Sequence, residues 1–165
     1  MALILETGSI VAGANTYVGV EDVRAYADAR GLTLPEPDGD VEVLLVKAMD
    51  FLEAQEGRMQ GARVDKDQEL SWPRSGVTVN GFELGEDAIP KQLKNAQCQL
   101  ACDAASTDLL PNGDGREVIR EKVDVLETEY AKTGSSAAQP QLVKAEALLA
   151  PLLSNSGFSL TLEHV

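Results

Sequence analysis

An apolar stripe between residues 89 and 110 constrains the fold of this chain more than any other feature. Pro90 suits the first turn of a helix, because the N–H that proline lacks is not needed there. The stripe recurs every three or four positions, which is the period of an α-helix with one buried face, at Ile89, Leu93, Ala96, Leu100, Ala101 and Ala104. We therefore predict a helix that begins near Ala88 and ends near Leu110.

Three shorter apolar patterns predict the other helices. The first helix covers about Val20 to Arg30, and the second runs from an Asp40 N-cap to about Glu56. A fourth helix is expected near residues 142–152, where Pro151 should bend it or end it early. Because aromatic residues make up only 4% of the chain, the core must be mainly aliphatic, which suits packed helices. We expect a core built from Val23, Leu45, Ala48, Leu52, Leu93, Ala96 and Leu100.

A β-hairpin is expected within residues 77–84. Apolar residues alternate with polar ones on both sides of Asn80-Gly81, which is the two-residue turn that hairpins prefer. Short strands are also expected near residues 118–130 and in the alternating tail.

The chain of 165 residues is long enough for one proper core. We predict a mainly α fold, a small bundle of three to four helices with a hairpin and short strands. Residues 1–132 would form the helical domain and 133–140 a flexible linker. Residues 141–165 would form a C-terminal helix and tail that docks on its own core or on a neighbour.

The only tryptophan lies in the segment "QELSWPRSGV", and two interpretations of it are open. An aromatic beside a cation can stack on a nucleic-acid base, or it can pin a loop to the core. Alternating apolar positions favour the anchor, which would consist of Leu70, Trp72, Pro73 and Gly76. Arg74 is expected outside the core, paired with a nearby acid or with a neighbouring subunit. The candidate contacts between subunits are Arg58, Arg63 and Arg74.

The formal charge is −13, from 27 acids and 14 bases. Such a charge repels phosphate backbones and anionic lipids at long range, so nucleic acid is not the default partner. The sequence has no apolar run long enough to cross a membrane, and its first residues are not laid out as a secretory signal. We expect a soluble intracellular protein with no membrane partner.

Motifs for catalysis and for metal binding are missing from the sequence. It contains no phosphate-binding glycine loop, no Ser-His-Asp arrangement and no His-Glu metal motif, and its only histidine is His164 near the C-terminus. Cys98 and Cys102 are four residues apart in a helical pattern, and we interpret them as small buried residues. We therefore expect no enzyme activity and no cofactor.

Six blocks of the sequence, in this order, resemble a family of tailed-phage and prophage proteins. They are "ANTYVGVEDVRAYADARG", "KAMDFLEA", "GARVDKDQELSWPRSGV", "IPKQLKNAQCQLA", "REKVDVLETEY" and "LLAPLL". The most specific element joins the Gln-x-Leu-x-Trp-Pro-Arg-x-Gly segment at residues 68–76 to Ile89-Pro90. Members are often described as DnaT-like single-stranded-DNA-binding proteins, and the family is also similar to the small helical head-to-tail connectors of phages. Met59-Gln60 stands where the family commonly has an aromatic residue.

The connector resemblance implies a structural protein of the virion neck, assembled in the host cytoplasm. Its subunits would form a homo-oligomeric ring, a dodecamer, between the portal protein and a stopper or tail-terminator protein. Genomic double-stranded DNA would pass through the ring without specific binding, which an acidic protein favours. The C-terminal segment would dock on the portal or on a neighbour through Leu148, Leu149, Leu152, Phe158, Leu160 and Leu162. The alternative is a single-stranded-DNA-binding replication accessory protein, which would need a basic groove with several aromatics.

Overall fold

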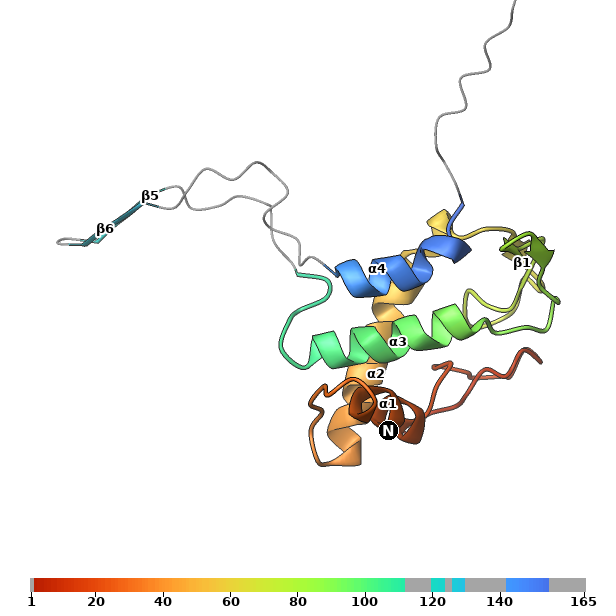
Figure 1. Ribbon diagram of the computed structural model, residues 1–165, viewed down its shortest axis with the longest axis horizontal. Coiled ribbons are helices and arrows are strands. Elements are labelled where there is room, and N and C mark those ends of the chain that lie inside the picture. Colours follow the sequence, from red (N-terminus) through yellow and green to blue (C-terminus); the bar gives the residue numbers. More distant parts are fainter. Residues whose placement is uncertain (1, 112–119, 124–125, 130–141, 155–165) are drawn as a thin grey trace, which may run out of the picture.

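The computed structural model of the chain describes residues 2–111, 120–123, 126–129 and 142–154. Helix α3 is central, because it packs against each of the other three helices (Figure 1). α4 runs beside α3 on one side, and α1 and α2 pack against other faces of α3. The four helices are α1 (Val20–Asp28), α2 (Asp38–Ala54), α3 (Lys91–Ala104) and α4 (Val143–Leu149). The fold is mainly α, as predicted.

The core lies where the inner faces of these helices meet on α3. Burial of apolar surface is the main favourable term in folding, and α3 carries more buried positions than its apolar stripe alone predicts, since Gln97 and Gln99 are also buried. The predicted core is confirmed, because each of its seven residues has 0% exposure: Val23, Leu45, Ala48, Leu52, Leu93, Ala96 and Leu100.

Three predicted helix ends are wrong. The third helix begins at Lys91, with Pro90 at the N-cap position, rather than near Ala88. The second helix begins at Asp38 rather than after Asp40, with Pro37 at the N-cap position and no side-chain cap. Arg24 fixes this start, because its guanidinium binds the Asp38 carboxylate at 2.8 Å and the carbonyl oxygens of Pro35 and Glu36. A side chain from α1 therefore holds the turn that leads into α2, although it does not cap the first N–H groups of that helix.

The third helix ends at Ala104 rather than near Leu110. Polar residues follow, and the carbonyl oxygen of Asp103 accepts hydrogen bonds from the backbone N–H groups of Ser106 and Thr107 and from the Ser106 hydroxyl. Serine side chains bond the nearby backbone as the Ser106 hydroxyl does here, and so favour turns over helix interiors.

Between α2 and α3 the chain forms a short 3₁₀ helix and two small antiparallel sheets. η1 (Glu56–Arg58) precedes β1 (Ala62–Arg63), which pairs with β2 (Arg74–Ser75). The predicted hairpin is confirmed as β3 (Thr78–Val79) paired with β4 (Phe82–Glu83).

Both residues of the hairpin turn have positive φ, 53° for Asn80 and 82° for Gly81. This is the requirement of a type I′ turn, whose twist matches that of the flanking strands. Strands expected near residues 118–130 are present as the antiparallel pair β5 (Arg120–Val123) and β6 (Leu126–Glu129).

α4 ends at Leu149 and continues as the 3₁₀ helix η2 (Ala150–Leu152), so the expectation that Pro151 ends the helix early is confirmed. η2 contacts both α3 and β3, which brings the end of the described chain beside the hairpin. The proposed linker at 133–140 and the tail strand at 155–165 lie outside the described residues. Within the part that is described, no helix combines the length and the apolar character needed to cross a bilayer.

Candidate functional site

Trp72 lies at the centre of a buried joint between the loop and the helices. We call residues 68–76, together with Glu53 and Met59 that contact them, the Trp72 joint. The Trp72 side chain is fully buried, and its indole Nε1 donates a hydrogen bond to the Met59 sulfur at 3.1 Å. Leu70 and Pro73 are buried in the same segment, and the peptide bond between Trp72 and Pro73 is cis. The indole is buried, as the anchor interpretation predicts, and it is not available to stack on a base.

Glu53 of α2 ties the backbone of the joint to the helical layer. Its carboxylate accepts hydrogen bonds from the backbone N–H and the hydroxyl of Ser71, both at 2.9 Å. The Tyr17 hydroxyl donates to this carboxylate at 3.1 Å and accepts from the backbone N–H of Trp72 at 3.1 Å. Burial, and then the negative charge of Glu53, raise the pKa of Tyr17. Tyr17 is therefore a neutral hydroxyl that links the N-terminal segment, α2 and the loop in one network.

Arg74 is buried, so the prediction that it lies outside the core is wrong. Only 6% of the residue is exposed. Its guanidinium donates to the carbonyl oxygens of Gln60 at 2.7 Å, Gly61 at 2.9 Å and Ser71 at 3.2 Å. Its ion-pair partner is Glu56, at 3.6 Å, which lies 18 positions earlier in the sequence. A guanidinium used in this way organises its own loop and is not free to reach a neighbouring subunit.

Arg63 closes the base of the same loop on η1. It binds the two carboxylate oxygens of Glu56 at 2.6 and 2.9 Å and donates a third hydrogen bond to the Gln68 carbonyl oxygen at 2.8 Å. The hydrogen bond from Arg63, with the positive charges of Arg63 and Arg74, holds the pKa of Glu56 below its ordinary value. The Arg63 side chain is 32% exposed, so its proposed role between subunits stays a prediction.

Two glycines lie beside the pair of strands β1 and β2, where the backbone of one strand comes close to that of the other. Gly61 has φ +67°, and a Cβ added there would overlap the carbonyl oxygen of Ser75. Gly76, which the sequence places in the anchor, has φ +71° and turns the chain after β2. Both conformations are strained for residues that carry a side chain.

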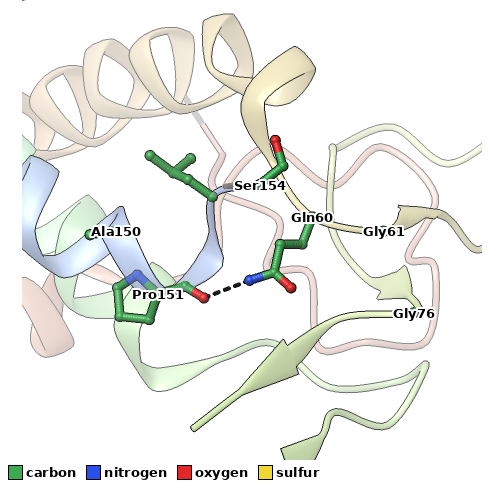
Figure 2. A pocket seen from close by; sticks show the side chains of 7 residues that line it. Gln60, Gly61, Gly76, Ala150, Pro151 and Ser154 are labelled. Atoms are coloured by element: carbon green, nitrogen blue, oxygen red, sulfur yellow. Dashed lines mark hydrogen bonds between the residues drawn. The ribbon is translucent and has the colours of Figure 1, made fainter. Parts of the chain in front are cut away.

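The end of the described C-terminal segment is fastened to the chain just before β1 (Figure 2). Gln60 donates its backbone N–H to the Leu152 carbonyl oxygen and its side-chain amide to that of Pro151, both at 2.9 Å. Ser154 donates its backbone N–H and its hydroxyl to the Arg58 carbonyl oxygen, at 2.7 and 2.9 Å. An open pocket of about 500 Å³ lies at this junction. The Arg58 side chain is exposed and bonds Gln55, so its proposed contact with a neighbour stays a prediction.

The proposed docking role of the C-terminal leucines needs a correction. Leu149 is 2% exposed and Leu152 is fully buried, because α4 packs on α3 of its own chain. These two side chains complete the core and are not available to a portal. Leu148 is only partly buried and remains a candidate. Phe158, Leu160 and Leu162 lie outside the described residues, and their docking role stays a prediction.

The cysteines have the character that the sequence suggested. Cys98 and Cys102 are free thiols with 3% and 8% exposure. Burial raises the pKa of Cys98 to about 12 and that of Cys102 to about 11. Neither thiol is a thiolate nucleophile near neutral pH. Among the residues that the structure places, no group of three or more His, Cys, Asp and Glu side chains could hold a metal ion.

Sequence reasoning missed the buried polar residues that organise the loops. Glu6 is 2% exposed and accepts hydrogen bonds from the backbone N–H groups of Gly8, Ile10 and Val11. Gln97 on α3 accepts from the Tyr17 N–H at 3.0 Å and donates to the Thr16 hydroxyl at 2.7 Å. The one available signal was Gln97 itself, a polar residue flanked by apolar positions of the α3 stripe.

These features define a small, mainly helical protein in which a buried tryptophan and a polar network fix the long connection between α2 and α3. A family model described as "Putative DnaT-like ssDNA binding protein" matches residues 1–165, and the chain belongs to this family. Comparisons with curated proteins and with solved structures found no match. The DnaT-like part of the resemblance seen in the sequence is confirmed, whereas the similarity to phage connectors stays a prediction.

Proposed function

We propose that this protein is a structural subunit of the neck of a tailed phage, where it forms a ring that joins the portal to the tail and extends the DNA channel. The observation that carries the proposal is the Trp72 joint. The segment around Trp72 is the most specific part of the family resemblance. In the structure this segment holds a loop, a hairpin and the C-terminal segment in fixed positions around the helices. A rigid body of this kind suits an assembly subunit.

The charge of the chain supports the same role. With a net charge of −13, the protein repels a DNA backbone, so a genome can slide past it without binding. The basic groups around the joint are engaged internally, since Arg63 and Arg74 both face Glu56. We propose no enzyme activity, no cofactor and no membrane partner. The expected location is the virion, after assembly in the host cytoplasm.

Electron microscopy tests the proposal. We expect negative-stain images of the protein mixed with its portal to contain rings seated on the portal, in the position where a tail would attach. Capsid proteins that do not contact the portal serve as the control. If the protein neither forms a ring alone nor joins one with the portal, the proposal is wrong.

The second candidate is a single-stranded-DNA-binding accessory protein of replication, and the family description favours it. Such proteins combine a basic groove with several stacking aromatics. Trp72, Tyr17, Tyr26 and Phe51 are buried here, and among the described aromatic residues Phe82 is the exposed one. A binding site on the described surface would therefore have to be built around Phe82 rather than Trp72.

Fluorescence anisotropy with a labelled single-stranded oligonucleotide distinguishes the two candidates. The neck proposal predicts no binding at low salt. Binding that weakens steeply as salt increases, and that falls in Phe82→Ala, would support the accessory role instead.

A further inference from the structure

Phe82 is the most exposed large apolar side chain in the described part of the molecule, at 77%. It lies directly after the Asn80-Gly81 turn, at the tip of the β3–β4 hairpin. Three of the five residues that follow are acidic and exposed, namely Glu83, Glu86 and Asp87. A rigid turn thus presents one aromatic ring in an acidic setting. We call this tip, residues 80–87, the knob.

An open pocket of about 580 Å³ lies between the end of α1, α3 and one side of α4. Its apolar lining comes from Tyr26, Leu32, Ala147 and Leu148, and its two charged lining residues are Arg30 and Lys144, both cations. We call this pocket the hole. Its volume falls in the range of protein pockets that hold small organic groups.

The groups behind the hole hold its shape. The Arg30 guanidinium lies 3.6 Å from the centre of the Tyr26 ring and donates to the Tyr26 carbonyl oxygen at 3.2 Å. The Tyr26 hydroxyl donates to the side-chain carbonyl of Gln99 at 3.2 Å, and the Gln99 amide donates to Asp103 at 2.9 Å. The one carboxylate in this network is therefore engaged from behind, and the lining itself presents positive charge.

The knob and the hole of one chain cannot meet. β4 is paired to β3 and leads into the N-terminal end of α3, whereas the hole is lined on α3 by Gln99, in the C-terminal half of that helix. Figure 1 shows β1 and the strands that follow it at one end of the helical layer. The two surfaces therefore face different directions on the molecule.

We propose that the knob of one copy of this chain docks in the hole of the next copy. The Phe82 ring would enter the apolar lining, while the acids of the knob would face Arg30 and Lys144. Complementary charge selects this orientation and excludes knob-to-knob contacts. Because the two surfaces differ, the contact is heterologous, and repeating it produces a ring when the rotation closes or a filament when it does not. The contact between knob and hole does not depend on the proposed neck function. Only the closure of repeated contacts into a ring rests on that function.

Two matched variants test the interface. The knob variant is Phe82→Ala, and the hole variant carries Arg30→Glu with Lys144→Glu. All three positions are exposed, so the circular dichroism spectra should match the wild type. Thermal melting should match for Phe82→Ala and fall slightly for the hole variant, which loses the contact of Arg30 with the Tyr26 ring. Val43→Ala, at an exposed apolar position on α2, serves as the control for losing surface apolar area.

Sedimentation velocity over a concentration series provides the measurement. We expect the wild type and Val43→Ala to self-associate, and Phe82→Ala to raise the apparent Kd by about 30-fold, as loss of an aromatic hot spot does. An equimolar mixture of the knob variant and the hole variant should form heterodimers and nothing larger, because each mixed pair has a single intact interface. Reversing the knob charges as well, with Glu83→Lys and Glu86→Lys, should restore association of the hole variant.

Two results would overturn the inference. One is a wild-type chain that stays monomeric at every concentration. The other is association that Phe82→Ala and the hole variant leave unchanged. In either case rings on the portal could still be observed by electron microscopy, so failure of this interface and failure of the proposed neck function are distinguishable.

Discussion

Trp72 and Phe82 belong to the same connection between α2 and α3, yet their environments are opposite. The Trp72 ring is fully buried and hydrogen-bonded through its indole N–H, whereas the Phe82 side chain is 77% exposed at a hairpin tip. Burial of an aromatic ring stabilises the folded state. An exposed ring adds little to the stability of the folded monomer, but it offers an apolar surface to a partner. The connection thus has an inner aromatic that stabilises the fold and an outer aromatic that we propose as a contact with a second copy.

The sharpest test of this difference is truncation of each ring. Trp72→Ala should lower the free energy of unfolding by about 3–5 kcal/mol, because it leaves a large cavity and removes the hydrogen bond to Met59. Phe82→Ala should change it by less than about 0.5 kcal/mol, because the side chain is exposed. Urea unfolding followed by circular dichroism measures both. Equal losses in the two variants would contradict the division between inner and outer rings.

The second-largest effect is expected where the backbone at Gly61 comes close to the backbone at Ser75. Gly61→Ala should cost about 2–3 kcal/mol, since the new Cβ meets the Ser75 carbonyl oxygen at a positive φ. Gly39→Ala is the matched control. Gly39 lies in α2, where an added Cβ would meet no other atom within 4 Å, so this change should be neutral or slightly stabilising. Thermal melting of the two variants provides the comparison.

A smaller effect is expected from the hydroxyl that links the joint to the N-terminal segment. Tyr17→Phe removes the donor to Glu53 and the acceptor for the Trp72 N–H while keeping the ring. The loss should be about 1–2 kcal/mol, since buried polar partners are left unsatisfied. Hydrogen exchange should show faster exchange at the Trp72 amide. Unchanged exchange there would mean that the network does not hold the loop.

The smallest effect concerns pH. Arg63 holds the pKa of Glu56 below its ordinary value in the folded state, so this carboxylate contributes stability at pH values above its unfolded pKa. The contribution is lost as the pH falls through the folded pKa. Unfolding measured over acidic pH should therefore be less pH-dependent in Glu56→Gln than in the wild type. A control variant, Glu86→Gln on the exposed knob, should retain the wild-type slope.

Positions that follow a periodic pattern could be predicted from the sequence. The seven core residues, the hairpin turn at Asn80-Gly81 and the inward orientation of Trp72 depend on local alternation or helical spacing, and all are confirmed. Period and turn chemistry are local properties, so a single chain displays them directly.

Features that depend on contacts between distant segments could not be predicted in this way. Arg74 is buried because three carbonyl oxygens and Glu56 surround it, and none of these is identifiable as its partner from spacing. The start of α2 is fixed by Arg24 of another helix. Leu149 and Leu152 complete the core because α4 returns to α3 across a long sequence separation. Tertiary contacts override the local signal in each case.

The bonds from Gln60 and Ser154 make the C-terminal segment a mechanical element as well as a structural one. Tension applied to the chain beyond Ser154 is borne first by its two bonds to the Arg58 carbonyl, and then by the Gln60 bonds to η2. Gln60 and Gly61 also supply carbonyl oxygens to Arg74, so part of the load passes to the Trp72 joint, beside the part that η2 passes to α3. A pull on one end of this protein is therefore transmitted to the loop that carries its exposed hairpin.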